Sequence, residues 1–198
     1  MAPAIGTLGA MGAAGGTGPI GPYPERVGET DEERDAYDRL RRRVLWTLPY
    51  GLYAVGSRAG ERRNLMTTNW VTQVSFEPKL VGIGVEHPAL THELITEGGS
   101  FTVCTIARED RAIVRKFTKP CEWDPAASTL NGFPVHEGAT GTPILSQAPA
   151  FLDCKVRQAV EVGNHTFFIG EVVDADFQVD DEATEVLRME DTRMNYGG

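Results

Sequence analysis

Two long strand-like segments joined by a two-residue turn constrain the fold of this chain most. They span residues 151–162 and 165–173, and Gly163-Asn164 lies between them. In the first segment, side chains that suit a buried face alternate with polar ones, the period of a β-strand. A glycine-containing dipeptide between two such runs is typical of a tight hairpin turn. We therefore predict a long antiparallel hairpin.

Further segments rich in Val, Ile, Thr, Tyr and Phe read as strands bounded by Gly or Pro. They are residues 51–55, 63–69, 80–85 and 100–106. Ser57-Arg58-Ala59-Gly60 resembles a hairpin turn between the first two. Helices are inserted among the strands instead of alternating with them, which favours a mainly β, closed or nearly closed barrel over a doubly wound sheet.

Three helices are predicted. The first runs from Thr30, which opens a capping box with Glu33, to Pro49. Its terminal arginines are interpreted as a solvated helix end more readily than as a phosphate-binding patch. The other two span residues 88–97, which Gly98-Gly99 follows, and 108–117, which Pro120 follows.

The remaining segments are rich in small residues. Residues 1–28 bury too little apolar surface to fold alone, so we expect a flexible or partner-embracing arm. Residues 119–150 are long for a structureless loop, so part of this segment should pack on the core. The expected division is an arm at 1–28, a helix at 29–48, a barrel at 49–180 and a tail at 181–198.

Composition excludes several classes of function. The net charge of −9 over 198 residues argues against an extended nucleic-acid interface. No apolar run is long enough to cross a bilayer, and the N-terminus lacks the pattern of a secretory signal. Cys104 and Cys154 lie in apolar runs and are expected to be buried, whereas Cys121 lies in a loop-like segment. We expect a soluble cytoplasmic protein with neither membrane nor nucleic-acid partners.

Most candidate catalytic motifs lack the neighbouring sequence pattern that their chemistry requires. Gly16–Gly21 matches the letters of a dinucleotide fingerprint but follows no strand. The histidines His87, His92, His136 and His165 offer no three converging ligands by spacing, so no metal site is expected. His165 begins a strand directly after the hairpin turn, where it could serve either structure or function.

Small polar side chains cluster between residues 64 and 91. Asn64, Thr67, Thr68 and Ser75 lie on or beside strands, and Thr91 lies near a predicted helix start. Hydroxyl groups and the backbone N–H groups of a helix start are the donors that hold phosphate. A site for a polar, anionic, aromatic ligand and an ordinary threonine-rich sheet are equally compatible with this composition.

These residues resemble the flavin reductase-like, FMN-binding split-barrel family. The similar pieces, in order, are Asn64-x-Met66-Thr67, Val74-Ser75-Phe76-x-Pro78, Leu80-Val81, Thr91-His92-Glu93-Leu94, Pro143–Leu152 and Val162–Val172. The last is similar to that family's Gly-Asp-His…Gly-Glu-Val strand. The resemblance covers residues 45–178.

The resemblance implies a six-stranded split β-barrel with Greek-key topology that works as a homodimer. It implies FMN, or FAD, near the dimer interface, with residues 66–70 along the ring edge and the loop at 86–91 at the phosphate. His165 would lie where nicotinamide stacks on the flavin. The cofactor-binding residues it implies are Asn64, Met66, Thr67, Thr68, Asn69, Trp70, Ser75, Glu86, His87, Leu90 and Thr91.

One position departs from the family pattern. Relatives often carry Lys or Arg where this chain has Glu86-His87, and a carboxylate repels phosphate. Either Glu86 points away, or His87 and a distant cation supply the charge. Arg62, Arg63 and Lys116 are the candidate cations.

The function implied is an NAD(P)H:flavin reductase, which passes hydride from NADH or NADPH to FMN or FAD. Reduced flavin would then serve a partner such as a flavin-dependent monooxygenase, or another acceptor. The alternatives are an enzyme that retains FMN and acts directly on a small substrate, a non-catalytic flavin-binding electron carrier, and a barrel that has lost flavin.

Overall fold

The structure, a computed structural model, describes residues 23–179 and 184–192. Most of the expected arm, the Gly16–Gly21 motif and the end of the expected tail lie outside these residues.

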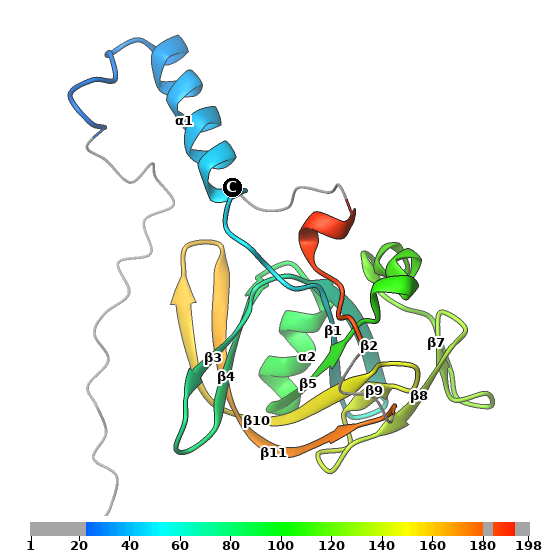
Figure 1. The fold of residues 1–198 in the computed structure, drawn as a ribbon. Helices are drawn as coiled ribbons and strands as arrows, with labels where there is room; N and C mark the ends of the chain where they lie inside the picture. Colours follow the sequence, from blue (N-terminus) through cyan, green and yellow to red (C-terminus); the bar gives the residue numbers. More distant parts are fainter. Residues whose placement is uncertain (1–22, 180–183, 193–198) are drawn as a thin grey trace, which may run out of the picture.

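A curved antiparallel sheet of seven strands dominates the fold (Figure 1). Its order is β2-β1-β5-β10-β11-β4-β3. The strands are β1 Tyr53–Ala59, β2 Arg62–Thr68, β3 Val71–Ser75, β4 Leu80–Glu86, β5 Ser100–Thr105, β10 Ala150–Val162 and β11 His165–Phe177. The mainly β, antiparallel class is confirmed. Closure is not, because no pairing joins the edge strands β2 and β3 within the described residues.

The predicted hairpin of β10 and β11 is confirmed. Val162 pairs with His165, and Gly163 adopts a left-handed φ of 61° in the turn. Two register shifts, one between Asp153 and Cys154, interrupt the alternation expected for β10. Asp153 is consequently buried, and its carboxylate accepts hydrogen bonds from the backbone N–H and the hydroxyl of Thr140 at 2.8 and 2.6 Å.

Two sequence interpretations at the sheet edges were wrong or incomplete. The turn after β1 is Gly60-Glu61, not residues 57–60, because Ala59 pairs with Arg62 and Gly60 supplies the left-handed φ of 58°. Strand β3 was not predicted. It pairs only with β4 and exposes most of its side chains, so it lacks the apolar pattern of a core strand.

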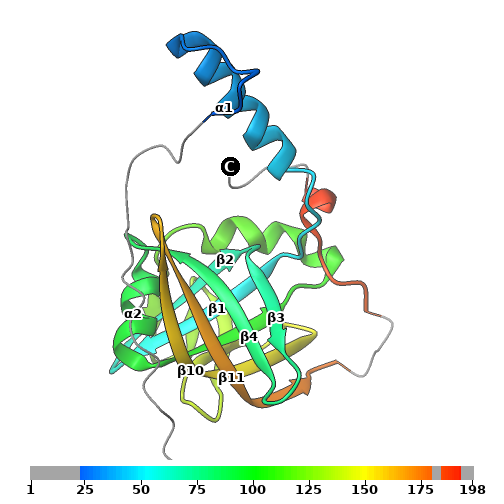
Figure 2. The same ribbon diagram turned by 90° about the vertical axis from the view of Figure 1, so that its left-hand side faces the viewer.

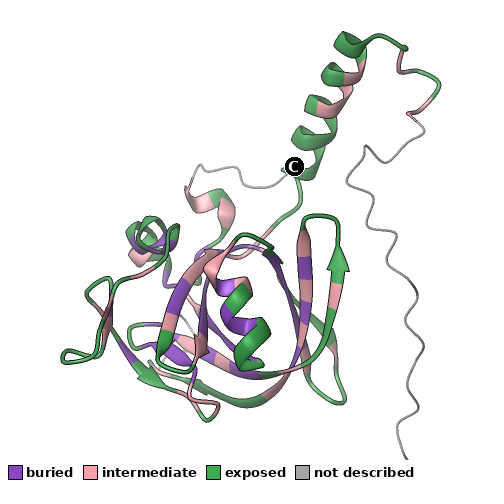
Figure 3. Ribbon diagram, turned by 180° about the vertical axis from the view of Figure 1, so that it is seen from behind, coloured by how far each residue is buried: buried purple, intermediate pink, exposed green. Residues whose placement is uncertain are grey.

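The helices begin and end close to where the sequence predicts. Helix α1, Asp31–Leu45, starts with the expected capping box and projects from the main sheet, and the rest of the described chain buries none of its residues (Figures 1 and 3). Helix α2, Leu90–Gly98, ends at Gly99. Residues Arg108–Phe117 form a 3₁₀-helix, η1, and Met189–Thr192 form a second, η2. No described helix has the length and apolar character needed to span a membrane.

A small second sheet fills the segment that was expected to pack on the core. Its strands are β6 Trp123–Asp124, β7 Thr129–Leu130, β8 Phe133–Glu137 and β9 Pro143–Leu145. Leu130, Ile144 and Leu145 are buried in one of two core clusters. The sheet thus covers one face of the main sheet.

The core lies on both faces of the central strands. In β1, Ala54 belongs to the cluster under the small sheet, and Val55 belongs to the cluster inside the curve. Cys104 and Val103 divide in the same way in β5. Helix α2 packs against β1, β2 and β4, and it lies at the left edge of the view in Figure 2. Burial on both faces explains why these strands read as nearly continuous apolar runs.

Candidate functional site

A cavity of about 270 Å³ lies between the end of β2 and the beginning of β11. Seven of the residues predicted from the sequence line it: Met66, Thr67, Thr68, Asn69, Trp70, Glu86 and His165. The first and last of them, Met66 and His165, are 99 positions apart in the chain, and the pairing of β11 with β4 brings His165 opposite Glu86. The ring-edge segment and the hairpin histidine therefore share one cavity.

Asn69 is the most unusual residue of the cavity. Its side chain is 1% exposed, and neither amide atom has a hydrogen-bond partner in the part of the chain that the structure describes. Leaving a buried amide unsatisfied costs about 1–3 kcal/mol. Asn69 lines the cavity, and its amide atoms are covered, so a rotation of the side chain would present a donor and an acceptor to a ligand that offers both groups, as the edge of a flavin ring does.

The aromatic rings of Trp70 and His165 form one wall. Their centroids are 4.7 Å apart, and their planes meet at 50°. Gly84 makes room for the indole, since a Cβ at this glycine would lie 3.0 Å from Trp70 Cε3. The wall therefore depends on a small residue in the neighbouring strand β4.

The threonines before Asn69 use their hydroxyl groups within the protein. Thr67 Oγ1 donates to the carbonyl of Val114 in η1 at 2.8 Å. Thr68 Oγ1 accepts from the backbone N–H of Trp70 at 3.4 Å. These bonds help to fix the segment beside the cavity.

Asn64 and Thr91 lie apart from the cavity. Both are buried, and Asn64 Nδ2 donates to Thr91 Oγ1 at 2.9 Å. Asn64 Oδ1 also accepts from the backbone N–H of Cys121 at 2.8 Å. The pair ties β2 to helix α2 and to the following loop. Ser75, His87 and Leu90 are also absent from the cavity lining.

Two of the three candidate cations for a phosphate, Arg62 and Arg63, are already paired with carboxylates. Arg62 donates to Glu93 and Glu97 at 2.5 and 2.6 Å. Arg63 Nη2 donates to Glu137 at 2.6 Å, and its guanidinium lies 4.7 Å from the centroid of a tryptophan ring. Glu86 lines the cavity, so its carboxylate belongs to the site's electrostatics.

His165 is held in a partly buried position. One ring nitrogen, Nδ1, lies 2.8 Å from Asn164 Oδ1. Burial is the largest effect on the pKa of His165 and lowers it. The charge of Glu86 raises this pKa by a smaller amount, and His87 lowers it further. The imidazole is therefore neutral near pH 7, which suits a ring that contacts another aromatic system.

Two features escaped the sequence interpretation. The cavity is completed by Leu52, Gly84, Ala89, Val114, Thr118 and Met189. Met189 comes from the expected tail, which reaches the core through the bridges Gly51–Arg188 and Ala107–Val186, and no local motif marks it.

In addition, His87, His92 and Glu161 converge, contrary to the expectation that no three metal-ligating side chains meet.

The chain is similar to proteins of known activity. A family model described as flavin reductase like domain matches residues 45–197. The ferric-chelate reductase (NAD(P)H) of Archaeoglobus fulgidus is 32% identical over 159 residues, which cover 78% of this chain and 90% of the relative. The NADH-dependent FAD reductase of Streptomyces globisporus is 32% identical over 71% of this chain and 78% of its own length.

The chain spans less than two thirds of the length of two other relatives. The high molecular weight rubredoxin of Moorella thermoacetica is 33% identical over 137 residues, and the chain spans 58% of its length. The chain also spans 64% of the length of an uncharacterized protein of Archaeoglobus fulgidus.

Solved structures agree in fold. The NADH:FAD oxidoreductase of Streptomyces globisporus superimposes with a TM-score of 0.67 at 28% identity, over 89% of this chain and all of that one. The flavin reductase component of a bacterial two-component tryptophan halogenase gives a TM-score of 0.67 at 26% identity, over 79% and 95% of the two chains.

Proposed function

The chain belongs to the flavin reductase like family, and on this premise we propose that it is an NAD(P)H-dependent flavin oxidoreductase. A bound flavin would supply the redox chemistry, with the nicotinamide as hydride donor. The protein's own contribution is to bind and orient the two rings and to adjust their electrostatics.

The partnerless amide of Asn69 is the observation that carries this proposal. A flavin ring edge offers carbonyl acceptors and a ring N–H donor, which complement both ends of a carboxamide. We propose that neighbouring backbone N–H groups of residues 67–69 stabilise negative charge on a reduced ring. We propose that residues 66–70 bind this edge, and that the cofactor is FMN or FAD.

His165 and Trp70 are proposed to hold the nicotinamide side. The 4.7 Å separation of their rings gives an aromatic wall beside the ring-edge segment. A neutral imidazole packs against a nicotinamide without opposing the positive charge that the ring acquires on oxidation. His165 is thus assigned a positioning role.

At the phosphate end, we propose that the start of helix α2 takes part. Ala89, at the N-cap, makes no side-chain hydrogen bond there, which leaves backbone N–H groups to face an anion. In the sequence-based assignment Asn64, Ser75, Glu86, His87, Leu90 and Thr91 surround the cofactor. The structure supports an indirect part for Asn64 and Thr91, which hold β2 against α2.

We further propose a homodimer built on a six-stranded Greek-key split barrel, with β3 as an added edge strand. Exposed apolar side chains support an interface, because such groups on a monomer mark contact surfaces. On and just after α1 they are Leu40, Val44, Leu45 and Leu48, which are 47–58% exposed. The division into arm, helix at 29–48, barrel at 49–180 and tail stays a proposal, and residues 184–192 pack on the barrel.

Localisation and partners complete the proposal. The free thiols of Cys104, Cys121 and Cys154 are consistent with a reducing cytoplasm. One structural neighbour is the reductase component of a two-component halogenase, which supports delivery of reduced flavin to a partner oxygenase.

Turnover kinetics test the function and separate it from its alternatives. The protein should oxidise NADH or NADPH only when FMN or FAD is added, with saturation in flavin. A flavin that stays bound through purification and turnover would favour an enzyme acting directly on a small substrate. A bound, reducible flavin without nicotinamide oxidation would favour an electron carrier.

A further inference from the structure

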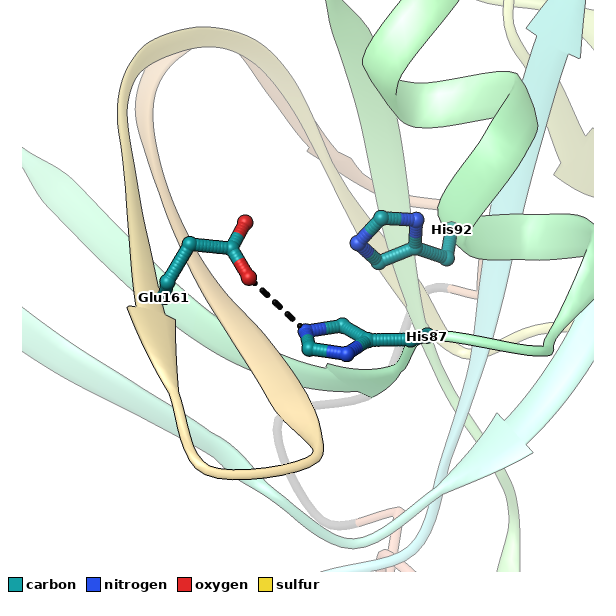
Figure 4. A group of neighbouring side chains, drawn as sticks. All are labelled: His87, His92 and Glu161. Carbon is teal, nitrogen blue, oxygen red and sulfur yellow. Dashed lines mark ion pairs between the residues drawn. The ribbon is translucent and has the colours of Figure 1, made fainter. Parts of the chain in front are cut away.

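Two histidines and a glutamate meet beside the cavity, outside its lining. His87 follows β4, His92 lies in the first turn of α2, and Glu161 lies near the end of β10 (Figure 4). One ligand atom from each residue lies within 4.8 Å of the others. Figure 4 shows the two imidazoles and the carboxylate facing one another across a small space.

The backbone holds these three elements in fixed relation. The N–H of His87 donates to the carbonyl of Asn164 in the hairpin turn at 3.1 Å. Glu161 pairs across the hairpin with Thr166. The His92 ring packs on Phe168, with 5.3 Å between centroids. The ligand groups therefore come from a framework that is ordered without an ion, which lowers the cost of binding one.

The side chains also have the chemistry of a divalent metal site. Two imidazoles and one carboxylate are the ligands preferred by Zn²⁺, Fe²⁺ and related ions, and together they carry one negative charge. Metal bonds of about 2.0–2.2 Å put neighbouring tetrahedral ligands roughly 3.3 Å apart. His87 Nε2 and Glu161 Oε2 are already 2.9 Å apart.

The third ligand needs a small rearrangement. His92 Nε2 lies 2.7 Å from the hydroxyl of Thr166, which donates to Glu161 Oε1 at 3.0 Å. Turning the imidazole from this hydroxyl toward the space between His87 and Glu161 exchanges one hydrogen bond for a metal bond. Thr166 keeps its bond to the carboxylate and so orients it from outside the ligand set.

We propose that His87, His92 and Glu161 bind a divalent transition-metal ion, with an open coordination position, and so fasten the β10–β11 hairpin to helix α2. The proposal does not require a bound flavin, but His87 also belongs to the phosphate end of the proposed cofactor site, so the metal is tested on flavin-free protein. The site adjoins the cavity, because Glu86 and His165 are the chain neighbours of His87 and Thr166.

The experiment is calorimetric titration of the untagged, metal-free and flavin-free protein with Zn²⁺. The wild type should bind one ion per chain with micromolar affinity. His92→Ala and Glu161→Gln should each weaken binding by about tenfold or more, a loss seen even for outer partners of metal sites. His136→Ala is the matched control, since its imidazole lies on β8 near Ser146, and it should bind like the wild type.

Two further measurements test whether each variant folds and whether the metal binds at the proposed residues. Thermal unfolding without metal shows that each variant folds, and Glu161→Gln keeps the size of the side chain if His92→Ala does not fold. With Co²⁺, the near-ultraviolet spectrum should lack the thiolate-to-cobalt charge-transfer band that binding at Cys121 would produce. Absence of binding, or binding that both variants retain, would overturn the proposal.

Discussion

Trp70 and His165, which are 95 positions apart in the chain, place their ring centroids 4.7 Å from each other. Trp70 follows the end of β2, and His165 begins β11, which pairs with β4. The wall they form exists only because the hairpin folds back over the ring-edge segment. The predictions below follow from this geometry and from the groups around it.

Replacement of His165 should affect hydride transfer more than cofactor binding. In His165→Ala the wall loses its imidazole while residues 66–70 keep their positions. We expect kcat/KM for NADH or NADPH to fall roughly 10–100-fold, since lost positioning raises the barrier. The dissociation constant for flavin should change by less than about threefold. Stopped-flow kinetics measures flavin reduction by the nucleotide, and fluorescence titration measures flavin binding. Equal losses in both quantities, or no loss in either, would assign His165 a structural role.

Asn69 and Asn64 should respond in opposite ways to the same substitution. Asn69→Leu removes an amide without partners, so the free energy of unfolding of the flavin-free protein should stay within about 1 kcal/mol of the wild type or rise. Asn64→Leu removes two hydrogen bonds, so this energy should fall by about 1–3 kcal/mol. Urea unfolding measures both.

Asn69→Leu should at the same time weaken flavin binding by roughly tenfold or more, because lost polar contacts of about 1.4 kcal/mol correspond to a factor of ten. Unchanged flavin affinity in a folded Asn69→Leu protein would remove Asn69 from the cofactor site.

The three thiols should differ in reactivity. Burial raises the pKa of Cys104 to about 11 and that of Cys154 to about 12, and it also raises the pKa of the partly buried Cys121. The thiolate is the reactive form, so the native protein should be alkylated at Cys121 alone and slowly. Mass spectrometry after iodoacetamide treatment checks this, with urea-unfolded protein, alkylated at all three, as the control. Fast native labelling of Cys104 or Cys154 would contradict the fold.

Acidification should weaken the fold through two histidines. Burial lowers the pKa of both His92 and His165 below the usual 6.5. Below about pH 6.5 the unfolded chain therefore binds protons that the folded protein does not, and stability falls as pH decreases. This contribution is fully present above that pH. Urea unfolding at about pH 7.5 and about pH 5.5 should show a smaller loss for His165→Gln than for the wild type. An equal or larger loss would contradict the shift assigned to His165.

Much of the fold follows from local patterns in the sequence. The turn at Gly163-Asn164, the capping box at Thr30 and the glycines after α2 each act over a few residues, so the elements they bound were predictable. Strand β3 was not, because none of its residues is fully buried, which leaves no clear period in the side chains. Residues 108–117 show helical periodicity, but the period does not distinguish α from 3₁₀ geometry in so short a segment.

The site was predictable in part for the same reason. Residues 66–70 are contiguous, and their resemblance to one family identified them together with His165. Met189, Val114 and Thr118 reach the cavity through tertiary contacts of η1 and of the C-terminal segment, which leave no mark in local sequence. The convergence of His87, His92 and Glu161 depends on the place where the β10–β11 hairpin meets α2. Motif rules for metal ligands compare residues that are close in the sequence, and Glu161 lies far along the chain from the two histidines.

The central claim is tested most directly by the flavin dependence of nicotinamide oxidation. The purified protein is mixed with NADH or NADPH, with and without added FMN or FAD, and the nicotinamide absorbance and the flavin spectrum are followed without oxygen. The account predicts that oxidation of at least one nucleotide requires flavin and reduces it in equal amount. Failure to bind either flavin, together with no flavin-dependent oxidation of either nucleotide, would contradict it.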